Sequence, residues 1–161
     1  MIESGHYCVA EICLNGHTTN CCANTDPVHN QKYCMDCGAV TVTKCQNCSS
    51  SIRGYFMAFR GDHPYKTPSF CHTCGEPYPW TISRMKAAAD LINEMESIND
   101  QEKKALIESV QEMTKDTPQS QVASVRYRKI IVKVGKETGD AMRDIIINIV
   151  SETIRRSLFG P

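Results

Sequence analysis

The stretch Lys32–Cys48, KYCMDCGAVTVTKCQNC, decides the fold of this chain, because it holds two Cys-x-x-Cys pairs close together. A third pair lies downstream in the run PSFCHTCGEP. The three pairs are Cys34/Cys37, Cys45/Cys48 and Cys71/Cys74. Two thiolates separated by two residues can both reach one ion from a tight turn, and this spacing is typical of tetrahedral zinc sites. The chain is therefore predicted to bind zinc.

A four-coordinate site needs two such pairs, so three pairs imply a fourth upstream. The run CLNGH, which begins at Cys13, is the best candidate, because its His is near in sequence and Gly16 supplies a turn. The predicted ligands of two zinc ions per chain are Cys13, His17, Cys34, Cys37, Cys45, Cys48, Cys71 and Cys74. The adjacent Cys21 and Cys22 are awkwardly spaced for holding one ion together. With Cys8, they are interpreted as ordinary buried or surface thiols.

Two arrangements of these four knuckles are open. Sequential ribbons would pair the first knuckle with the second and the third with the fourth, whereas a cross-braced arrangement would pair the first with the third and the second with the fourth. The sequential arrangement is favoured, because each ribbon then closes a short local loop. Gly38 and Gly75 follow two of the pairs, as a turn with positive φ requires, and Ser49 makes the middle knuckle less ideal.

All ten cysteines lie in the first 74 of the 161 residues. The start, MIESGHYCVA, shows no secretory signal, and no apolar run approaches the length of a membrane span. Cys-x-x-Cys pairs in a chain that is not exported indicate metal sites in a reducing cytoplasm rather than disulfides. We therefore expect a cytoplasmic α+β protein. Its parts are a small two-zinc β-ribbon module over residues 1–80 and a helical bundle or oligomerisation domain over residues 81–161.

Three strands are predicted in the first part, over residues 9–12, 39–43 and 52–59, the last of them broken by Gly54. The last strand region carries Arg53, Tyr55, Phe56, Phe59 and Arg60. These side chains could stack on single-stranded nucleic acid or on a peptide. We favour the alternative that the aromatic side chains cover the second zinc site, since a zinc module has few other apolar residues to bury.

The second part follows a predicted hinge containing Pro77, Pro79 and Trp80, and its apolar spacing is helical. About four helices are expected, with N-caps or first residues at Thr81, Asn99, Thr117 and Thr138 or Gly139, and ends near Met95, Lys115, Gly135 and Gly160. The IIVKV run at residues 130–134 also has strong β propensity. The last helix carries a broad apolar stripe. It is interpreted as the central helix of a four-helix bundle, with a dimer interface or an in-plane membrane helix as alternatives.

Charge does not favour a simple nucleic-acid binder. The chain has 18 basic and 18 acidic residues. Residues 1–80 hold five Lys/Arg and six Asp/Glu, and residues 81–161 hold thirteen and twelve. Neither half has the positive excess expected of a protein that binds phosphates.

The order CLNGH, KYCMDCGAVTVTKCQNC, SIRGY and FCHTCGEPYPWT resembles a bacterial family, the domain of unknown function numbered 2321. The resemblance covers about residues 8–82, and the helical half matches only in general character. It implies a bacterial, cytoplasmic zinc-ribbon protein and carries the same eight ligands that are named above. It implies no catalytic role.

The chain carries no phosphate loop, nucleophile elbow or paired-His motif, and Cys-rich sets close a zinc site to substrate. We therefore expect no enzymatic activity. The favoured function is an adaptor that binds a protein partner or assembles with itself through its C-terminal helices. A nucleic-acid module for RNA or single-stranded DNA is the alternative, although charge does not favour it. A membrane-acting or defence-system effector that uses the last amphipathic helix is a further one, and charge does not favour a membrane partner either.

Overall fold

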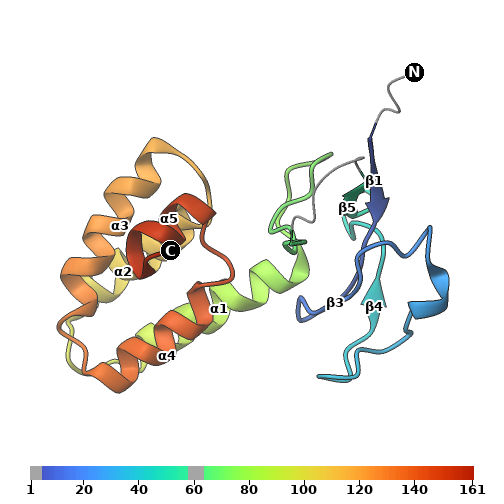
Figure 1. The fold of residues 1–161 in the computed structure, drawn as a ribbon. Coiled ribbons are helices and arrows are strands. Elements are labelled where there is room, and N and C mark those ends of the chain that lie inside the picture. The colour runs from blue at the N-terminus through green and yellow to red at the C-terminus, as the bar shows by residue number, and fades with distance from the viewer. Residues whose placement is uncertain (1–4, 58–63) are drawn as a thin grey trace. The chain divides into compact units, whose positions relative to one another are not determined.

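A computed structural model describes residues 5–57 and 64–161. The chain divides into two units, Met1–Ile82 and Ser83–Pro161. The first contains short antiparallel strands and the second contains helices (Figure 1), so the expected α+β class is confirmed. Phe59 and Arg60, which belong to the predicted aromatic strand, lie outside the described residues.

Two small sheets form the first unit. Strand β1 (His6–Val9) pairs with β5 (Arg53–Met57), and β2 (Glu11–Cys13) lies between β3 (Thr18–Asn20) and β4 (Thr41–Val42). A short 3₁₀ helix, η1 (Pro27–His29), follows β3. The single strand predicted over residues 9–12 is thus two strands, because the chain changes sheet at Ala10. The amide of Ala10 donates to the carbonyl of Ile52 at 2.9 Å, and Ala10 is fully buried.

Gly54 does not break its strand, contrary to the prediction. It lies inside β5, where the carbonyl oxygen of Cys21 would be only 2.1 Å from a Cβ atom at this position. The amide of the next residue, Tyr55, donates to that same carbonyl at 2.9 Å. Glycine is therefore required here by the close approach of another backbone segment.

The core of the first unit is small and lies beside the later cysteines. It contains Ala10, Ile12, Ile52, Tyr78 and Trp80 together with Cys45 and Cys71. Tyr78 and Trp80 stack with their ring centroids 4.6 Å apart, and the Trp80 indole donates to the carbonyl of Pro68 at 2.8 Å. Trp80, expected in a hinge, is 1% exposed and belongs to this core.

Five helices follow, rather than about four: α1 (Pro79–Asn93), α2 (Asp100–Met113), α3 (Pro118–Ile131), α4 (Lys136–Ile146) and α5 (Glu152–Phe159). Thr81, expected as the N-cap of the first helix, lies within α1. The helix already begins at Pro79. The Thr81 hydroxyl donates to the carbonyl of Ser69 at 2.8 Å. The predicted capping box at Asn99 and the helix start at Pro118 are confirmed.

The prediction of one long final helix is wrong. The chain leaves α4 after Ile146 and starts again at α5, where the Ser151 side chain accepts from the amide of Ile154. Ile149 and Val150, between the two helices, are each 1% exposed. The broad apolar stripe is therefore part of the core of the second unit, which it shares with residues of the other helices. Gly135, expected to end α3, is instead the N-cap of α4.

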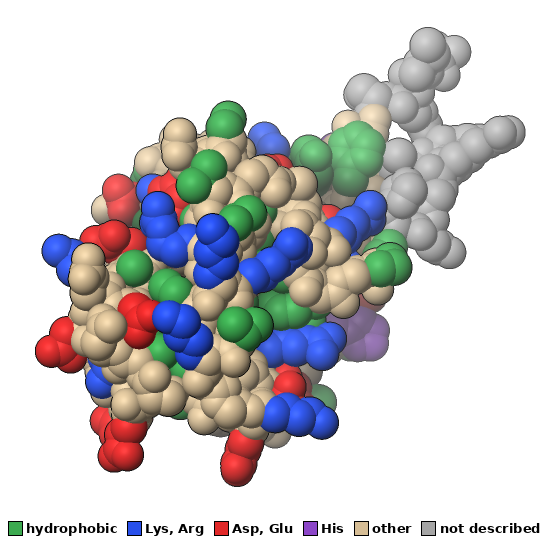
Figure 2. Space-filling view, turned by 90° about the vertical axis from the view of Figure 1, so that its left-hand side faces the viewer, with side chains coloured by type: hydrophobic (Ala, Val, Ile, Leu, Met, Phe, Trp, Pro, Cys, Tyr) green, Lys and Arg blue, Asp and Glu red, His purple; other side chains and the backbone are tan. Residues whose placement is uncertain are grey.

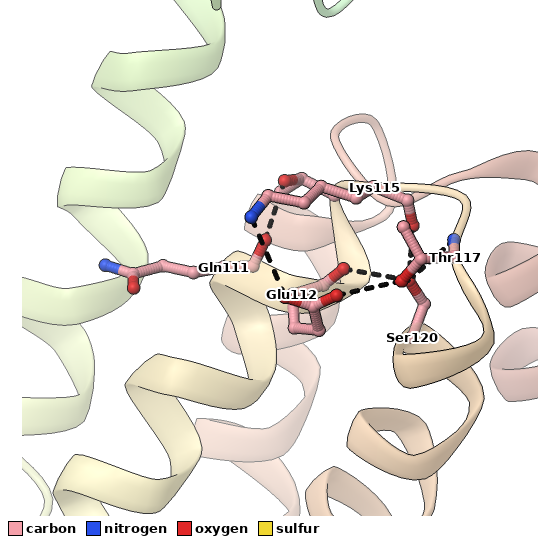
Figure 3. A network of polar contacts seen from close by, with 6 residues as sticks. Gln111, Glu112, Lys115, Thr117 and Ser120 are labelled. Carbon is pink, nitrogen blue, oxygen red and sulfur yellow. Dashed lines mark hydrogen bonds and ion pairs between the residues drawn. The ribbon is translucent and has the colours of Figure 1, made fainter.

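A compact polar network joins α2 to α3 (Figure 3). The Ser120 hydroxyl lies 3.0 Å from the carbonyl of Glu112 and 2.5 Å from that of Lys115, and it accepts from the amide of Thr117 at 3.2 Å. The Thr117 hydroxyl donates to the Glu112 carboxylate at 2.8 Å. Ser120 is fully buried, so this network satisfies backbone groups where one helix ends and the next begins.

Candidate metal centres

Three equivalent turns present the Cys-x-x-Cys pairs. In each, the amide four residues after the first cysteine donates back to that cysteine's carbonyl, at 2.8 to 2.9 Å. The residues that bracket the turns form isolated antiparallel bridges, Tyr33↔Val40, Lys44↔Ser51 and Phe70↔Pro77. This shared pattern shows that each pair is shaped by its own short segment of sequence.

The residue after each pair has positive φ. Gly38 has φ of +71° and Gly75 of +76°, whereas Ser49 adopts +62° without the freedom of glycine. Gly16, in the CLNGH turn, has φ of +88°. The middle knuckle therefore forms the same turn as its neighbours, at a conformational cost that they avoid.

The first cluster joins Cys13, His17, Cys34 and Cys37. Cys13 ends β2, and the turn at Gly16 brings the His17 ring back so that its Nδ1 lies 3.6 Å from the sulfur atoms of both Cys13 and Cys34. The sulfur atoms of Cys13 and Cys37 lie 3.7 Å apart. Cys13 and Cys34 are buried, whereas His17 and Cys37 are exposed.

The second cluster joins Cys45, Cys48, Cys71 and Cys74. Its sulfur atoms lie 3.8 Å apart between Cys45 and Cys74 and 3.7 Å apart between Cys48 and Cys71. In both clusters all four ligand atoms lie within 4.8 Å of one another. The structure thus brings the eight predicted residues together in the sequential arrangement.

These separations fit one tetrahedral ion in each cluster. Four sulfur atoms held about 2.3 Å from a zinc ion lie about 3.8 Å apart, and a sulfur and an imidazole nitrogen lie about 3.6 Å apart. Disulfide-bonded sulfur atoms would lie about 2.05 Å apart. The two groups could therefore hold two metal ions, and each would supply all four ligands from protein.

Hydrogen bonds prepare some of these thiols for a cation. The backbone amide of Ala39 lowers the pKa of the Cys37 thiol to about 6, and the Asn15 side chain adds to this effect. The Ser50 hydroxyl lies 3.3 Å from the sulfur of Cys71 and lowers the pKa of that thiol to about 5. Metal binds to the thiolate form, so the lowered pKa values of Cys37 and Cys71 favour metal binding at neutral pH.

Asn15 and Ser50 are the supporting residues that sequence reasoning missed. The Asn15 amide donates to the sulfur of Cys37 at 3.4 Å, although the two residues are in different knuckles. Ser50 likewise lies 3.1 Å from the sulfur of Cys48. Polar residues beside a knuckle are common in any turn, so their type carried no distinguishing signal; only the folded clusters show what they contact.

Two of the remaining cysteines are not free thiols, contrary to the interpretation from sequence. Cys8 in β1 and Cys22 form a disulfide, with their Cα atoms 4.8 Å apart. Cys21 remains a separate, partly buried thiol. The pairing arises because β1 lies next to the segment that follows β3, where the amide of Ala23 donates to the carbonyl of Val9 at 2.8 Å.

Phe56, one of the aromatic side chains expected over the second cluster, packs elsewhere in the first unit. Phe56 packs on Tyr7 with ring centroids 4.8 Å apart, and 43% of it is exposed. The Arg53 guanidinium lies 4.7 Å from the Tyr7 ring centroid. Ile52, Tyr78 and Trp80 share a core with two cysteines of the second cluster.

The comparisons with known proteins point to one family. A family model described as an uncharacterized protein conserved in bacteria (DUF2321) matches residues 6–158. The match includes both cysteine clusters, helices α1 to α4 and α5 as far as Leu158. No curated protein and no solved structure matches the chain. Within residues 5–57 and 64–161, no helix has the length and apolar character needed to cross a membrane.

Proposed function

We propose, from the premise that the chain belongs to this family of bacterial proteins, that it is a non-catalytic zinc-ribbon adaptor. The observation that carries the proposal is that each cluster offers four protein ligands with tetrahedral spacing. A catalytic zinc site usually keeps one position for water or substrate. A set of four ligands, three or four of them thiolates, suits a structural ion that holds the shape of a small core.

Zinc is the ion that we propose for both clusters. Soft thiolate ligands in a tetrahedral arrangement favour zinc over hard cations such as Mg²⁺ and Ca²⁺. Two zinc ions per chain would stabilise a unit whose apolar core is only a few residues large.

The proposed partner is a protein that binds the helical unit. Support for this comes from α3 and its C-cap, where Val122, Val125 and Val132 are 54%, 49% and 79% exposed. The apolar stripe of the last part of the sequence offers less exposed surface, because most of its residues are buried in the core. The proposal therefore places the contact on the outer side of α3 instead of on the final helix.

Cobalt substitution tests whether the metal sites are closed. Protein loaded with Co²⁺ in place of zinc should bind two ions and show the visible absorption of tetrahedral thiolate sites. Added azide should leave that spectrum unchanged, because no coordination position is open to it. A spectral shift with azide, or an uptake of one ion only, would contradict the closed-site proposal.

Photo-crosslinking tests the adaptor role. A photoreactive residue placed at Val125 in living bacteria should give one defined protein adduct. The same residue at Val28, which is 80% exposed in the first unit, is the matched control. The adduct should re-form with the purified partner, or with a second copy of the chain. The absence of any specific adduct at Val125 would count against this surface.

Nucleic-acid binding is a second candidate, favoured by the charge of one segment. Residues 117–136 contain five basic residues, Arg126, Arg128, Lys129, Lys133 and Lys136, and no Asp or Glu. Figure 2 shows Lys and Arg side chains gathered across the middle of the face of the helical unit that it presents. Counting charge by halves of the chain averages this segment with its acidic neighbours.

A salt titration of binding to oligo(U) RNA and to single-stranded DNA tests this candidate. Binding should weaken steeply with salt. The double change Arg126→Gln and Lys129→Gln should reduce the slope of log binding constant against log salt concentration by about two. Lys104→Gln, which removes an exposed charge from α2, is the control. A lack of binding at low salt would remove this candidate and leave the adaptor proposal unaffected.

A further inference from the structure

A cleft opens in the second unit among α3, α4 and α5. Its volume is about 470 Å³, within the range of small-molecule sites. Its apolar lining includes Tyr127 and Ile131 of α3 and Leu158 and Phe159 of α5. Tyr127 is 3% exposed, and the other three are partly buried. The cleft is separate from both cysteine clusters, which belong to the first unit.

Three cationic side chains line the same cleft, Arg128, Lys136 and Arg143, against one carboxylate, Asp140. Two of the cations are held in place. The Arg128 guanidinium donates to the backbone carbonyl and, at 2.9 Å, to the hydroxyl of Ser157. The Arg143 guanidinium lies 5.3 Å from the centroid of the Phe159 ring, as in a cation–π contact.

Two glycines leave space on the α4 side. A Cβ atom at Gly135 or Gly139 would have no neighbouring atom within 4 Å, and both residues line the cleft. Gly135 is also the N-cap of α4, and it has no side chain to occupy the amides of the first turn. The partial positive charge of that helix end adds to the charge of the three side chains.

We propose that this cleft binds a small anionic amphiphile, a molecule with a flat or extended apolar body and one carboxylate, phosphate or sulfonate group. The apolar body would cover Ile131, Leu158 and Phe159, and the anionic group would meet Lys136 and the two guanidinium groups. Charge complementarity excludes a cation, because three positive groups face one negative group. The site requires neither metal ion.

The probe for the first experiment is 8-anilinonaphthalene-1-sulfonate, whose fluorescence rises in apolar surroundings. The zinc-loaded full chain should bind one molecule saturably, and amide shifts by NMR should map to α3, α4 and α5. N-phenyl-1-naphthylamine has the same aromatic body without the sulfonate. It should bind at least about tenfold more weakly, because it gains no charge-assisted hydrogen bond. Equal binding of the neutral probe would overturn the proposal.

Matched variants locate the site. Lys136→Gln and Arg143→Gln should each weaken binding of the sulfonate probe by about tenfold. Arg126→Gln and Lys129→Gln remove the same charge from α3 residues that do not line the cleft, and they should leave binding unchanged. Circular dichroism checks that every variant is folded, since partly folded states also bind this probe. If the cleft variants and the control variants weakened binding equally, the probe would be attracted to the basic surface in general, and the proposed site would be wrong.

Competition separates two sources of such an anion. Monomeric laurate should displace the probe if the ligand is a free acyl carboxylate. Displacement by vesicles of phosphatidylglycerol but not by laurate would mean attraction to a membrane surface, which contradicts a small-ligand site. Displacement by neither would show that the cleft does not accept an acyl anion, and it would also overturn the proposal.

Discussion

Ser49 stands in the left-handed turn where the other two Cys-x-x-Cys knuckles have glycine. Its φ of +62° is the only positive value among the described residues other than glycine. A side chain in this conformation costs about 1 kcal/mol or more relative to glycine. The cost falls on a turn that supplies ligands to the second cluster, so it bears directly on the stability of the metal site.

Ser49→Gly should therefore stabilise the zinc-loaded protein by about 1 kcal/mol. Gly38→Ala is the reverse test, because open space surrounds the missing Cβ and only φ opposes the change. It should destabilise the protein by a similar amount. Denaturant unfolding followed by Trp80 fluorescence measures both. Identical midpoints for the two variants would show that the turn conformation carries no such cost.

Gly54 is constrained by contact and not by φ. A Cβ atom there would lie 2.1 Å from the Cys21 carbonyl oxygen and 3.0 Å from the amide nitrogen of Ala10, both backbone atoms. We expect Gly54→Ala to destabilise the protein by about 3 kcal/mol, because two chain segments must move apart. Gly139→Ala, in open space on α4, should stabilise by about 0.5–1 kcal/mol. A denaturation series checks both, and a tolerated Gly54→Ala would contradict the close packing.

At the scale of elements, side-chain hydrogen bonds near the helix ends explain where the helices begin and stop. The connection from α2 to α3 is short, and the buried Ser120 hydroxyl contacts the carbonyls of Glu112 and Lys115 and the amide of Thr117 (Figure 3). The Asn99 side chain caps the start of α2 in the same manner, by accepting from the amide of Glu102 at 2.9 Å. Each cap uses a residue within a few positions of the helix end.

Ser120→Ala should destabilise the second unit by about 1–3 kcal/mol, since the carbonyls of Glu112 and Lys115 and the Thr117 amide lose this partner. Ser124→Ala is the control, because Ser124 is also buried but its hydroxyl donates to the carbonyl of Gln121 in its own helix. That change should have little effect. Thermal unfolding followed by circular dichroism measures the difference. A loss of similar size in both variants would mean that burial, and not the network, decides the outcome.

At the scale of the whole molecule, the two units are stabilised by different means. The first has a few core residues and both candidate metal clusters, and the second has a continuous apolar core and no cysteine. Removal of the metal should unfold the first unit and leave most of the helical signal. Chelation with far-ultraviolet circular dichroism and Trp80 emission tests this, since Trp80 lies in the first core. Complete loss of helix on chelation would show that the second unit depends on the first.

Metal binding should also depend on pH. The folded pKa values of Cys37, about 6, and Cys71, about 5, lie below the ordinary thiol value. At pH values above these, the unfolded chain therefore binds more protons than the folded chain. The resulting contribution to the stability of the folded protein is fully present above the ordinary thiol pKa of about 8.5. It is lost as the pH falls through about 6 and then about 5, where we expect zinc to be released.

A zinc indicator dye measures release as the pH is lowered. Ser50→Ala removes the hydroxyl that lowers the pKa of Cys71. Release from this variant should therefore begin at a higher pH than from the natural sequence. Asn15→Ala should produce a smaller shift at the first cluster, because the Ala39 amide is the larger cause there. A release midpoint that Ser50→Ala does not change would contradict this role.

The sequence by itself determined the features that depend on neighbouring residues. The Cys-x-x-Cys turns, the capping box at Asn99 and the start of α3 at Pro118 all follow from a few adjacent side chains, so spacing alone predicted them. The sequential grouping of the cysteines also follows from short loops, which cost less chain entropy to close. The exact strand ends were less accurate, because short strands depend on which other strand they meet.

Only the tertiary structure decided the features that join distant segments. The disulfide between Cys8 and Cys22, the contact of Gly54 with the Cys21 carbonyl and the burial of Ile149 each need two stretches of chain to meet. The anion cleft likewise combines residues of three helices. Residue type and periodicity do not predict these contacts, because burial and close approach are properties of the packed chain.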